Sequence, residues 1–241
     1  IGGNKINWDL QIPVFSEFFK SVAWDARGYG QSDDYEGDLD FSDFSHDLIR
    51  VLDYFGEEKA HLCGLSMGGR IAQDFYALYP DRVSSLVLCD TFAGDDTKDT
   101  RSGRYQSIEE FVETRIRPFL DGATPREQAQ NRGGSLLAPG HSEDARRRSI
   151  EASAQLHVES YIKTVRASAK FTRVDNLKNI DVPTLLVFGE LAPLTPPTVG
   201  EYMQERIPDA KMVIIKDAGH MTNLEKPEIF NKAVVEFLLK L

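Results

Sequence analysis

The stretch that most constrains the fold runs from residue 59 to residue 80, KAHLCGLSMGGRIAQDFYALYP. Residues 61–65 form a short apolar run containing glycine, which is typical of a buried strand. From Ile71 onward apolar residues recur at helical spacing, until Pro80 ends the segment. A strand that leads directly into a helix is the repeating unit of α/β folds, so the stretch predicts a parallel sheet with helices packed against it.

The turn between this strand and helix reads Gly64-Leu65-Ser66-Met67-Gly68, a G-x-S-x-G pattern. So sharp a turn strains the serine backbone, and we expect side chains at Gly64 or Gly68 to collide with neighbouring chain. The Ser66 hydroxyl would stand above the sheet at a helix N-terminus, where the Met67 N–H can donate to a developing oxyanion. The alternative is an ordinary serine cap on a glycine-rich helix start. The position between strand and helix favours a nucleophile.

Length and composition bound the class of protein. At 241 residues the chain can bury one sizeable core, as one α/β domain or as one with a modest insertion. A formal net charge of −10 argues against nucleic acid or an anionic membrane as partner. No apolar run reaches the roughly 18 residues of a membrane span, and no signal-peptide core opens the sequence, so we expect a cytoplasmic protein. Cys63 and Cys89 fall in predicted buried strands and are expected to be packed free thiols, offering neither a metal site nor a disulfide framework.

Strands and helices alternate over most of the chain. We expect a polar turn at 25–32, a helix over 42–55 with Ser42 as its N-cap, and Gly56 as the residue that ends that helix. The remaining apolar runs and periodic segments predict strands at 20–24, 85–89, 184–189 and 212–215, and helices at 197–206 and 227–239.

The alternation breaks after Asp90. Residues 94–104 are polar and loop-like, and three helical stretches follow without a strand between them, at 107–120, 142–156 and 158–170. An all-helical insert between two strands would cover the carboxyl edge of the sheet, where ligands bind in open α/β folds. We therefore expect a core in two parts with a helical cap between them, over residues 1–94, 95–175 and 176–241.

A serine nucleophile needs a base, and the base needs a group that orients it. The candidate base is His220, because a histidine on a loop just past the strand at 212–215 can point into the same crevice as Ser66. The other histidines lie in a helix, inside the strand before the turn, or in the insert: His46, His61, His141 and His157.

Five motifs follow one another along almost the whole chain: Asp25-x-Arg27-Gly28-x-Gly30-x-Ser32, Cys63 to Gly69, Leu86 to Asp90, Val182 to Leu185, and Ala218-Gly219-His220. In this order and spacing they resemble an α/β-hydrolase of the small esterase, 3-oxoadipate enol-lactonase-like and C–C hydrolase branch. The resemblance implies an α/β-hydrolase fold with Ser66 as nucleophile, His220 as general base and the Met67 N–H as one oxyanion donor. It implies neither a metal nor an organic cofactor.

The sequence departs from this family where the catalytic acid is expected. Relatives usually read Gly-x-x-Asp-Pro-x-Thr-Pro, whereas residues 189–196 read GELAPLTP and place Ala192 at the aspartate position. Ala192 can be an engineered substitution that slows turnover, or Asp90 can supply the acid from the end of an earlier strand. Glu190 is a third candidate, but two residues earlier its side chain should diverge from the histidine. Loss of the orienting group lowers kcat about 10⁴-fold in the serine-protease case.

A second departure lies at the start of the chain. Ile1-Gly2-Gly3-Asn4 resembles the oxyanion loop that follows a His-Gly pair in the family, while the earlier strands are absent from this sequence. A protein without these strands would expose a sheet edge, which is costly. We therefore expect that the first strands exist in the protein and are missing from this sequence. If His-Gly precedes Ile1, the Ile1 N–H is the second oxyanion donor, with Gly2 as the alternative.

Together these patterns predict a hydrolase that cleaves a small ester or lactone through an acyl-enzyme. One alternative is a hydrolase of the carbon–carbon bond in a vinylogous diketone, using the same triad. Another is a non-catalytic ligand-binding protein on a hydrolase fold, suggested by Ala192. The cap would select the substrate, and its candidate lining residues are Phe92, Phe111, Phe119, Leu136, Leu137 and Tyr161.

Overall fold

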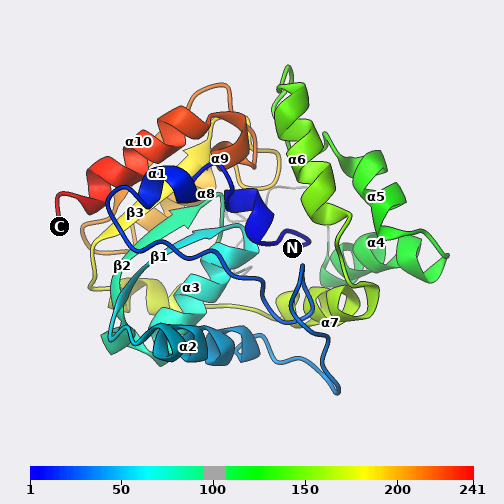
Figure 1. The fold of residues 1–241 in the computed structure, drawn as a ribbon, viewed down its shortest axis with the longest axis horizontal. Helices are drawn as coiled ribbons and strands as arrows, with labels where there is room; N and C mark the ends of the chain where they lie inside the picture. Colours follow the sequence, from blue (N-terminus) through cyan, green and yellow to red (C-terminus); the bar gives the residue numbers. More distant parts are fainter. Residues whose placement is uncertain (95–106) are drawn as a thin grey trace.

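The computed structural model describes residues 1–94 and 107–241. At the centre of the described chain lies a parallel sheet of four strands in the order β1-β2-β3-β4 (Figure 1). The strands are β1 (Ala60–Leu65), β2 (Val83–Cys89), β3 (Thr184–Gly189) and β4 (Lys211–Ile215). Because β2 and β3 are paired neighbours, the chain leaves the sheet after Cys89 and returns beside the same strand.

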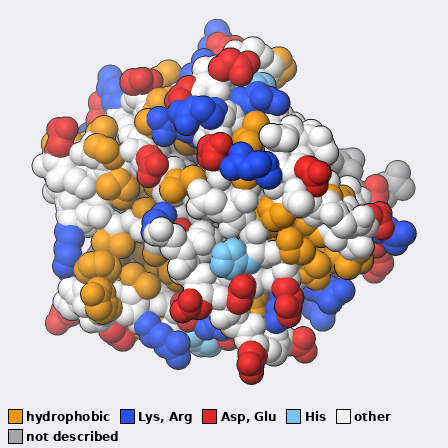
Figure 2. Space-filling model, turned by 45° about the vertical axis from the view of Figure 1, so that its right-hand side comes forward, with side chains coloured by type: hydrophobic (Ala, Val, Ile, Leu, Met, Phe, Trp, Pro, Cys, Tyr) orange, Lys and Arg blue, Asp and Glu red, His pale blue; other side chains and the backbone are white. Residues whose placement is uncertain are grey.

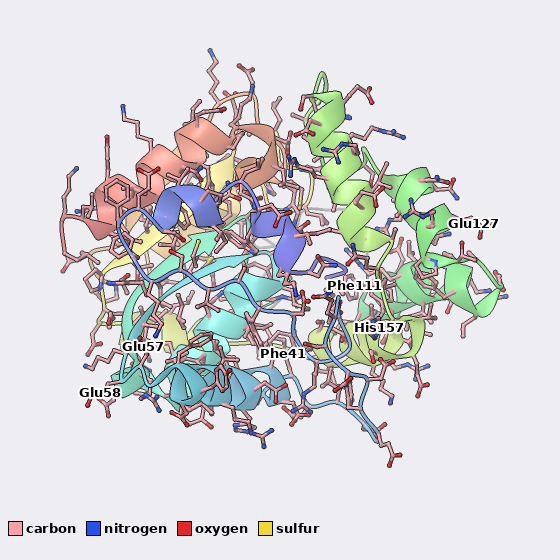
Figure 3. All side chains as sticks on the ribbon, in the orientation of Figure 1. Phe41, Glu57, Glu58, Phe111, Glu127 and His157 are labelled. Atoms are coloured by element: carbon pink, nitrogen blue, oxygen red, sulfur yellow. The ribbon has the colours of Figure 1, made fainter. Side chains whose placement is uncertain are left out.

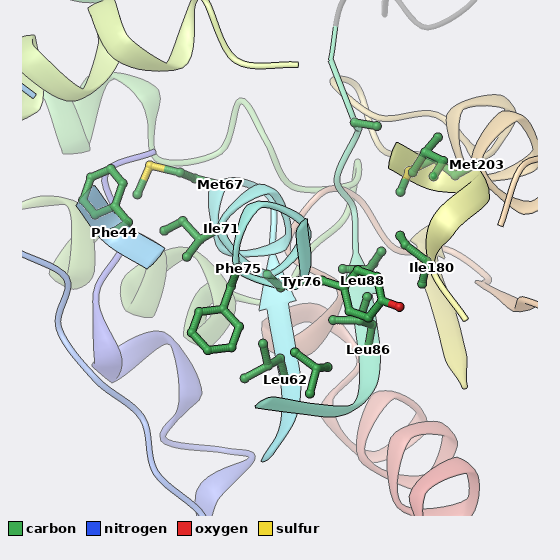
Figure 4. Packing of buried hydrophobic residues seen from close by; sticks show 14 of the residues in the cluster. Phe44, Leu62, Met67, Ile71, Phe75, Tyr76, Leu86, Leu88, Ile180 and Met203 are labelled. Carbon is green, nitrogen blue, oxygen red and sulfur yellow. The ribbon is translucent and has the colours of Figure 1, made fainter. Parts of the chain in front are cut away.

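Helices cover both faces of the sheet, because alternate residues of each strand point to opposite sides. Leu86 and Leu88 of β2 belong to a core shared with α2 (Asp43–Phe55), α3 (Met67–Leu78) and α8 (Pro197–Gln204); Figure 4 shows part of this packing. Val87 and Cys89 belong to a second core, shared with α1 (Ile12–Phe15) and α10 (Pro227–Leu238). Both leucines are fully buried, and such burial stabilises a fold by about 1.5–3 kcal/mol per side chain.

Four helices lie together beside the sheet and its covering helices, on the right of Figure 1. They are α4 (Ile108–Leu120), α5 (Pro125–Arg132), α6 (Glu143–Ser153) and α7 (Val158–Ser168). The predicted absence of a strand from this region holds for its described residues, 107–170. The predicted loop at 94–104 lies, beyond Gly94, outside the described residues, as does the first part of the expected cap.

Helix α5 was missed by the sequence analysis. Thr124 and Glu127 form a reciprocal capping box, and Pro125 occupies the first turn. The eight residues of the helix are nearly all polar, with Ala129 as the buried exception. Without an apolar stripe, hydrophobic periodicity does not detect such a helix.

The prediction of a strand at residues 20–24 is wrong. Residues 20–24 belong to no strand in the described structure. A strand needs a partner backbone for its hydrogen bonds, and here a hollow lined by both Lys20–Trp24 and Ala60–Leu65 separates the segment from β1. Composition alone does not reveal whether such a partner is in reach.

Two details of the predicted elements also differ. Ser42 makes no side-chain cap of α2, because its hydroxyl donates to Asp74 instead. Gly56 does end α2, in the left-handed conformation with φ of 69°. Cys63 is half-buried because β1 is an edge of the described sheet, whereas Cys89 is buried as predicted and both thiols are free.

The other predicted strands and helices are confirmed within a few residues of their expected ends. Short helical turns connect them, namely η1 (Lys5–Trp8), η2 (Pro80–Arg82), η4 (Val174–Asn179) and α9 (Thr222–Glu225). On the face drawn in Figure 2, acidic and basic side chains are interspersed, with hydrophobic patches between them. Among the described helices, none has the length and apolar character that a membrane span requires.

Candidate active site

The turn at Ser66 is strained as expected. Ser66 adopts φ 53° and ψ −113°, a conformation that costs a non-glycine residue about 1–3 kcal/mol. Two hydrogen bonds hold it there: the Ser66 N–H donates to the Cys89 carbonyl at 2.8 Å, and the Thr91 hydroxyl donates to the Ser66 carbonyl at 2.6 Å. The end of β2 thus fixes the serine between β1 and α3.

Of the two glycines expected to be constrained at this turn, one is constrained and the other is not. A Cβ at Gly64 would lie 2.3 Å from the Gly68 carbonyl oxygen, so no side chain fits at position 64. The same expectation for Gly68 is wrong, because a Cβ there meets nothing within 4 Å. The second constrained position is Gly69, whose Cβ would lie 2.6 Å from the Thr91 side chain.

His220 lies on the loop between β4 and α9 and is buried. The ring Nδ1 of His220 is 2.9 Å from the Thr195 hydroxyl, and the backbone N–H of His220 donates to the Leu136 carbonyl at 2.8 Å. Ser66 and His220 line one cavity of about 540 Å³, which also extends along β1. The two residues that the sequence predicts as nucleophile and base thus line the same cavity.

The carboxylate of Glu225 fixes the backbone around His220. It accepts hydrogen bonds from the N–H groups of Gly219 and Met221, and from that of Ala138 in the segment between α5 and α6. The histidine loop is therefore tied to the helical region over the sheet edge. Sequence reasoning missed Glu225 and Thr195, since neither forms a local motif with His220.

Asp90, the alternative acid, is fully buried at the end of β2 with φ 42°. One carboxylate oxygen accepts from the Gly189 N–H at 2.9 Å, and the other accepts from the Thr222 hydroxyl at 2.7 Å. Burial raises the pKa of Asp90 well above its ordinary value, although these two bonds act in the opposite direction. Through Thr222, Asp90 supports the loop that carries His220.

Ala192 and Glu190 follow β3, next to the histidine loop. The Leu191 N–H donates to the Ala218 carbonyl at 2.8 Å, which places the two loops side by side, and Ala192 is buried there. The Glu190 carboxylate accepts a hydrogen bond from the Asp217 N–H, on the same loop as His220.

Three backbone N–H groups were predicted to hold an oxyanion. Met67 begins α3, so its N–H is among those that have no partner within the helix. Met67 and Ile1 line the cavity together with Ser66. Gly2 has φ of 99°, a conformation that favours glycine, and it packs against Leu156 and Tyr161.

The remaining histidines and the expected cap residues are placed as follows. The other histidines contact polar groups elsewhere: His46 the Tyr79 hydroxyl, His61 the Ser85 hydroxyl, His141 the Ala138 carbonyl and His157 the Asp34 carboxylate. Of the six predicted lining residues, Leu136 lines the cavity. The others pack in hydrophobic clusters: Phe111, Phe119 and Tyr161 with Ile1, Leu137 with Met221, and Phe92 on the main core. Within residues 1–94 and 107–241, no group of three or more His, Cys, Asp or Glu side chains could hold a metal ion.

The sheet order, the strained serine turn and the histidine loop together define an α/β hydrolase fold. The family of that description matches residues 1–227, and the chain belongs to it. This confirms the resemblance and the fold class predicted from the sequence.

Similar proteins in this family are hydrolases of different substrates. The chain is 29% identical over 229 residues to 3-oxoadipate enol-lactonase 1 of Acinetobacter baylyi, covering 92% of this chain and 80% of that protein. It is 28% identical over 235 residues to a 2-hydroxy-6-oxononadienedioate/2-hydroxy-6-oxononatrienedioate hydrolase of Paraburkholderia phymatum, covering 91% and 76%. A solved thermophilic esterase from Thermogutta terrifontis matches with a TM-score of 0.84 and 27% identity, over 99% of this chain and 86% of that one.

Proposed function

We propose that this protein is a serine hydrolase that cleaves a small ester or lactone through an acyl-enzyme. The observation that carries the proposal is the common cavity of Ser66 and His220, with the serine held on a strained turn at the start of α3. The enol-lactonase and esterase similarities support the same class of substrate.

In this mechanism the Ser66 hydroxyl attacks the substrate carbonyl carbon while His220 accepts its proton. The tetrahedral oxyanion receives hydrogen bonds from the Met67 N–H and from the N–H of Ile1 or Gly2. Collapse of this intermediate breaks the bond to the alcohol oxygen, which takes the proton from His220. His220 then removes a proton from water as the water attacks the acyl carbon, and it returns this proton to Ser66 Oγ when the bond to the serine breaks and the acid leaves.

In this mechanism a further group orients the His220 imidazole. We assign that role to Thr195, through its hydroxyl beside Nδ1, with Asp90 and Glu225 fixing the loop from behind. A threonine does not stabilise an imidazolium as a carboxylate does, so turnover should be lower than in relatives with aspartate at the position of Ala192.

The helices α4 to α7 act, in this proposal, as a cap that belongs to residues 95–175 and selects the substrate. The region adjoins the site through Leu136, in the segment between α5 and α6: Leu136 lines the cavity, and its carbonyl accepts a hydrogen bond from the backbone N–H of His220. Leu156 and Tyr161 lie near Gly2, since a Cβ at that position would stand 3.7 and 3.9 Å from their side chains.

The direct test is covalent labelling with a fluorophosphonate, followed by mass spectrometry to locate the adduct. We expect one adduct, on Ser66, and none in the Ser66→Ala variant. Hydrolysis of p-nitrophenyl acetate should depend on Ser66 in the same way. An adduct on another serine, or equal turnover by Ser66→Ala, would contradict the proposal.

A second candidate function is hydrolysis of a carbon–carbon bond in a vinylogous diketone, favoured by the similarity to the Paraburkholderia hydrolase. Turnover of a ring-fission product, compared with that of an enol-lactone and p-nitrophenyl acetate, separates the two. The third candidate, a binding protein without catalysis, rests on Ala192 and predicts that no ester is hydrolysed even after aspartate is restored there.

A further inference from the structure

The segment between α5 and α6 lies directly against the loop that carries His220. The backbone N–H of His220 donates to the Leu136 carbonyl at 2.8 Å. A Cβ at Gly219 would lie 2.5 Å from the Ala138 nitrogen and 2.7 Å from the Leu136 carbonyl oxygen, so no side chain fits between the two backbones. We call residues 136–138 the cap segment. It meets the histidine loop backbone to backbone, at the glycine that precedes the candidate base.

One carboxylate is bonded to both of these segments. Oε2 of Glu225, the last residue of α9, accepts from the Ala138 N–H at 2.7 Å and from the Gly219 N–H at 3.0 Å. Oε1 accepts from the N–H groups of Gly219 and Met221, at 3.1 and 3.2 Å. Hydrogen bonds to a carboxylate are shorter and stronger than those between neutral groups. Glu225 therefore holds the backbone on both sides of His220 and the cap segment at the same time.

The two segments belong to different parts of the fold. The cap segment follows α5, the helix that carries Glu127 at the right of Figure 3, whereas the histidine loop follows β4 of the sheet. Leu136 of the cap segment lines the cavity together with Ser66 and His220. The cap-side wall of the cavity and the loop of the candidate base thus share one hydrogen-bonded side chain.

We propose that Glu225 is a positioning residue that fixes the Leu136 wall of the cavity relative to His220, and so limits the length of the acyl group that the enzyme accepts. The inference rests on the proposed function and adds a determinant of specificity to it. The cap segment cannot move away from the cavity without losing its hydrogen bonds to Glu225 and His220. An acyl group on Ser66 therefore meets a wall of fixed position. The competing explanation is structural: Glu225 would stabilise the histidine loop without any effect on substrate selection.

Hydrogen–deuterium exchange tests the link without any turnover. Glu225→Gln keeps the shape of the side chain but replaces one acceptor oxygen by an NH2 group, which donates and does not accept. We expect the amides of residues 136–141 and 217–222 to exchange faster together, by about 10-fold, because both segments open locally when their common acceptor is weakened. The control is Glu228→Gln, an exposed glutamate at the start of α10, which should exchange as the wild type does. Faster exchange of residues 217–222 alone would contradict the inference.

Steady-state kinetics with p-nitrophenyl acetate and p-nitrophenyl hexanoate tests the effect on selection. Leu136→Ala shortens the wall and should raise the ratio of kcat/KM for hexanoate to that for acetate about 10-fold, the scale of discrimination by a few methylene groups. Glu225→Gln should raise this ratio as well, and the double variant should raise it no further than the larger single effect. An unchanged ratio in Glu225→Gln, or fully additive effects, would overturn the inference.

Gly219→Ala is a second, independent way to part the two segments, because its Cβ would stand between their backbones. It should reproduce both the joint exchange and the shift in the ratio. A wild type that hydrolyses neither ester would contradict the proposed function, while joint exchange of the two segments would still support the role of Glu225 in holding them. Turnover that depends on Ser66, with wild-type exchange and an unchanged ratio in Glu225→Gln, would overturn the inference and leave the proposed function intact.

Discussion

The Thr222 hydroxyl donates a 2.7 Å hydrogen bond to Asp90, which joins the end of β2 to the loop that carries His220. The other carboxylate oxygen accepts from the Gly189 N–H at the end of β3. One fully buried side chain thus links three segments beside the candidate active site. Because Asp90 is not among the residues that line the cavity of Ser66 and His220, we expect it to support the histidine loop rather than to contact substrate.

The pH dependence of stability tests this role of Asp90. Its folded pKa is raised by burial, so folding favours the protonated carboxyl. The stabilisation is therefore complete below the unfolded pKa of about 4 and is lost as pH rises from there through the folded value. Asp90→Asn, which resembles the protonated form, should be less sensitive to pH over that interval, as measured by urea unfolding at a series of pH values.

Turnover of Asp90→Asn gives the complementary result. If Asp90 only supports the loop, the variant should retain more activity than Ser66→Ala. Abolished turnover with an unchanged pH dependence of stability would instead identify Asp90 as the catalytic acid, the alternative left open by the sequence.

A matched pair of glycine substitutions tests the geometry of the serine turn. Gly64→Ala should destabilise the protein by about 1–3 kcal/mol, because its Cβ would lie 2.3 Å from a backbone oxygen that cannot easily move. Gly68→Ala should be neutral or stabilising by up to about 1 kcal/mol, since the Cβ meets open space and alanine favours a helix. Chemical denaturation of the two variants checks the difference. Equal losses would mean that the turn is not built as described.

Features that lie within one segment of the chain could be predicted from the sequence, whereas contacts between distant segments could not. Short apolar runs located most strands, the 3.6-residue periodicity located most helices, and a local pattern located Ser66, because these signals lie within a single segment. The contact of Thr195 with His220 depends on how distant segments pack, because Thr195 comes from the loop after β3. For the same reason the pattern indicated Gly68, whereas contact with Thr91 makes Gly69 the constrained position.

Thr195 should act on activity through His220. Thr195→Val removes the hydroxyl beside Nδ1 while keeping the shape of the side chain, so the imidazole loses a partner that fixes its orientation and tautomer. We expect kcat for p-nitrophenyl acetate to fall about 10-fold, in line with one hydrogen bond of roughly 1–1.5 kcal/mol, with KM little changed.

The conservative variant Thr195→Ser restores the hydroxyl and should recover most of that rate. It should also recover the pH–rate profile, whose lower limb reports the pKa of the base. If Thr195→Ser is as slow as Thr195→Val, packing of the buried methyl group, rather than the hydrogen bond, accounts for the effect.

Placing a carboxylate at position 192 tests whether the missing aspartate limits turnover. Ala192 is buried on the loop that runs beside Ala218, two residues before His220, so an aspartate there would lie near the imidazole. A carboxylate on Nδ1 stabilises the imidazolium that forms during attack, and its loss costs about 10⁴-fold in the serine-protease case. We therefore expect Ala192→Asp to raise kcat for p-nitrophenyl acetate by orders of magnitude. Ala192→Asn, of the same size but uncharged, is the control and should give little increase, because it lacks the charge that stabilises the imidazolium. A near-zero rate in both variants would instead favour a protein that binds its ligand without cleaving it.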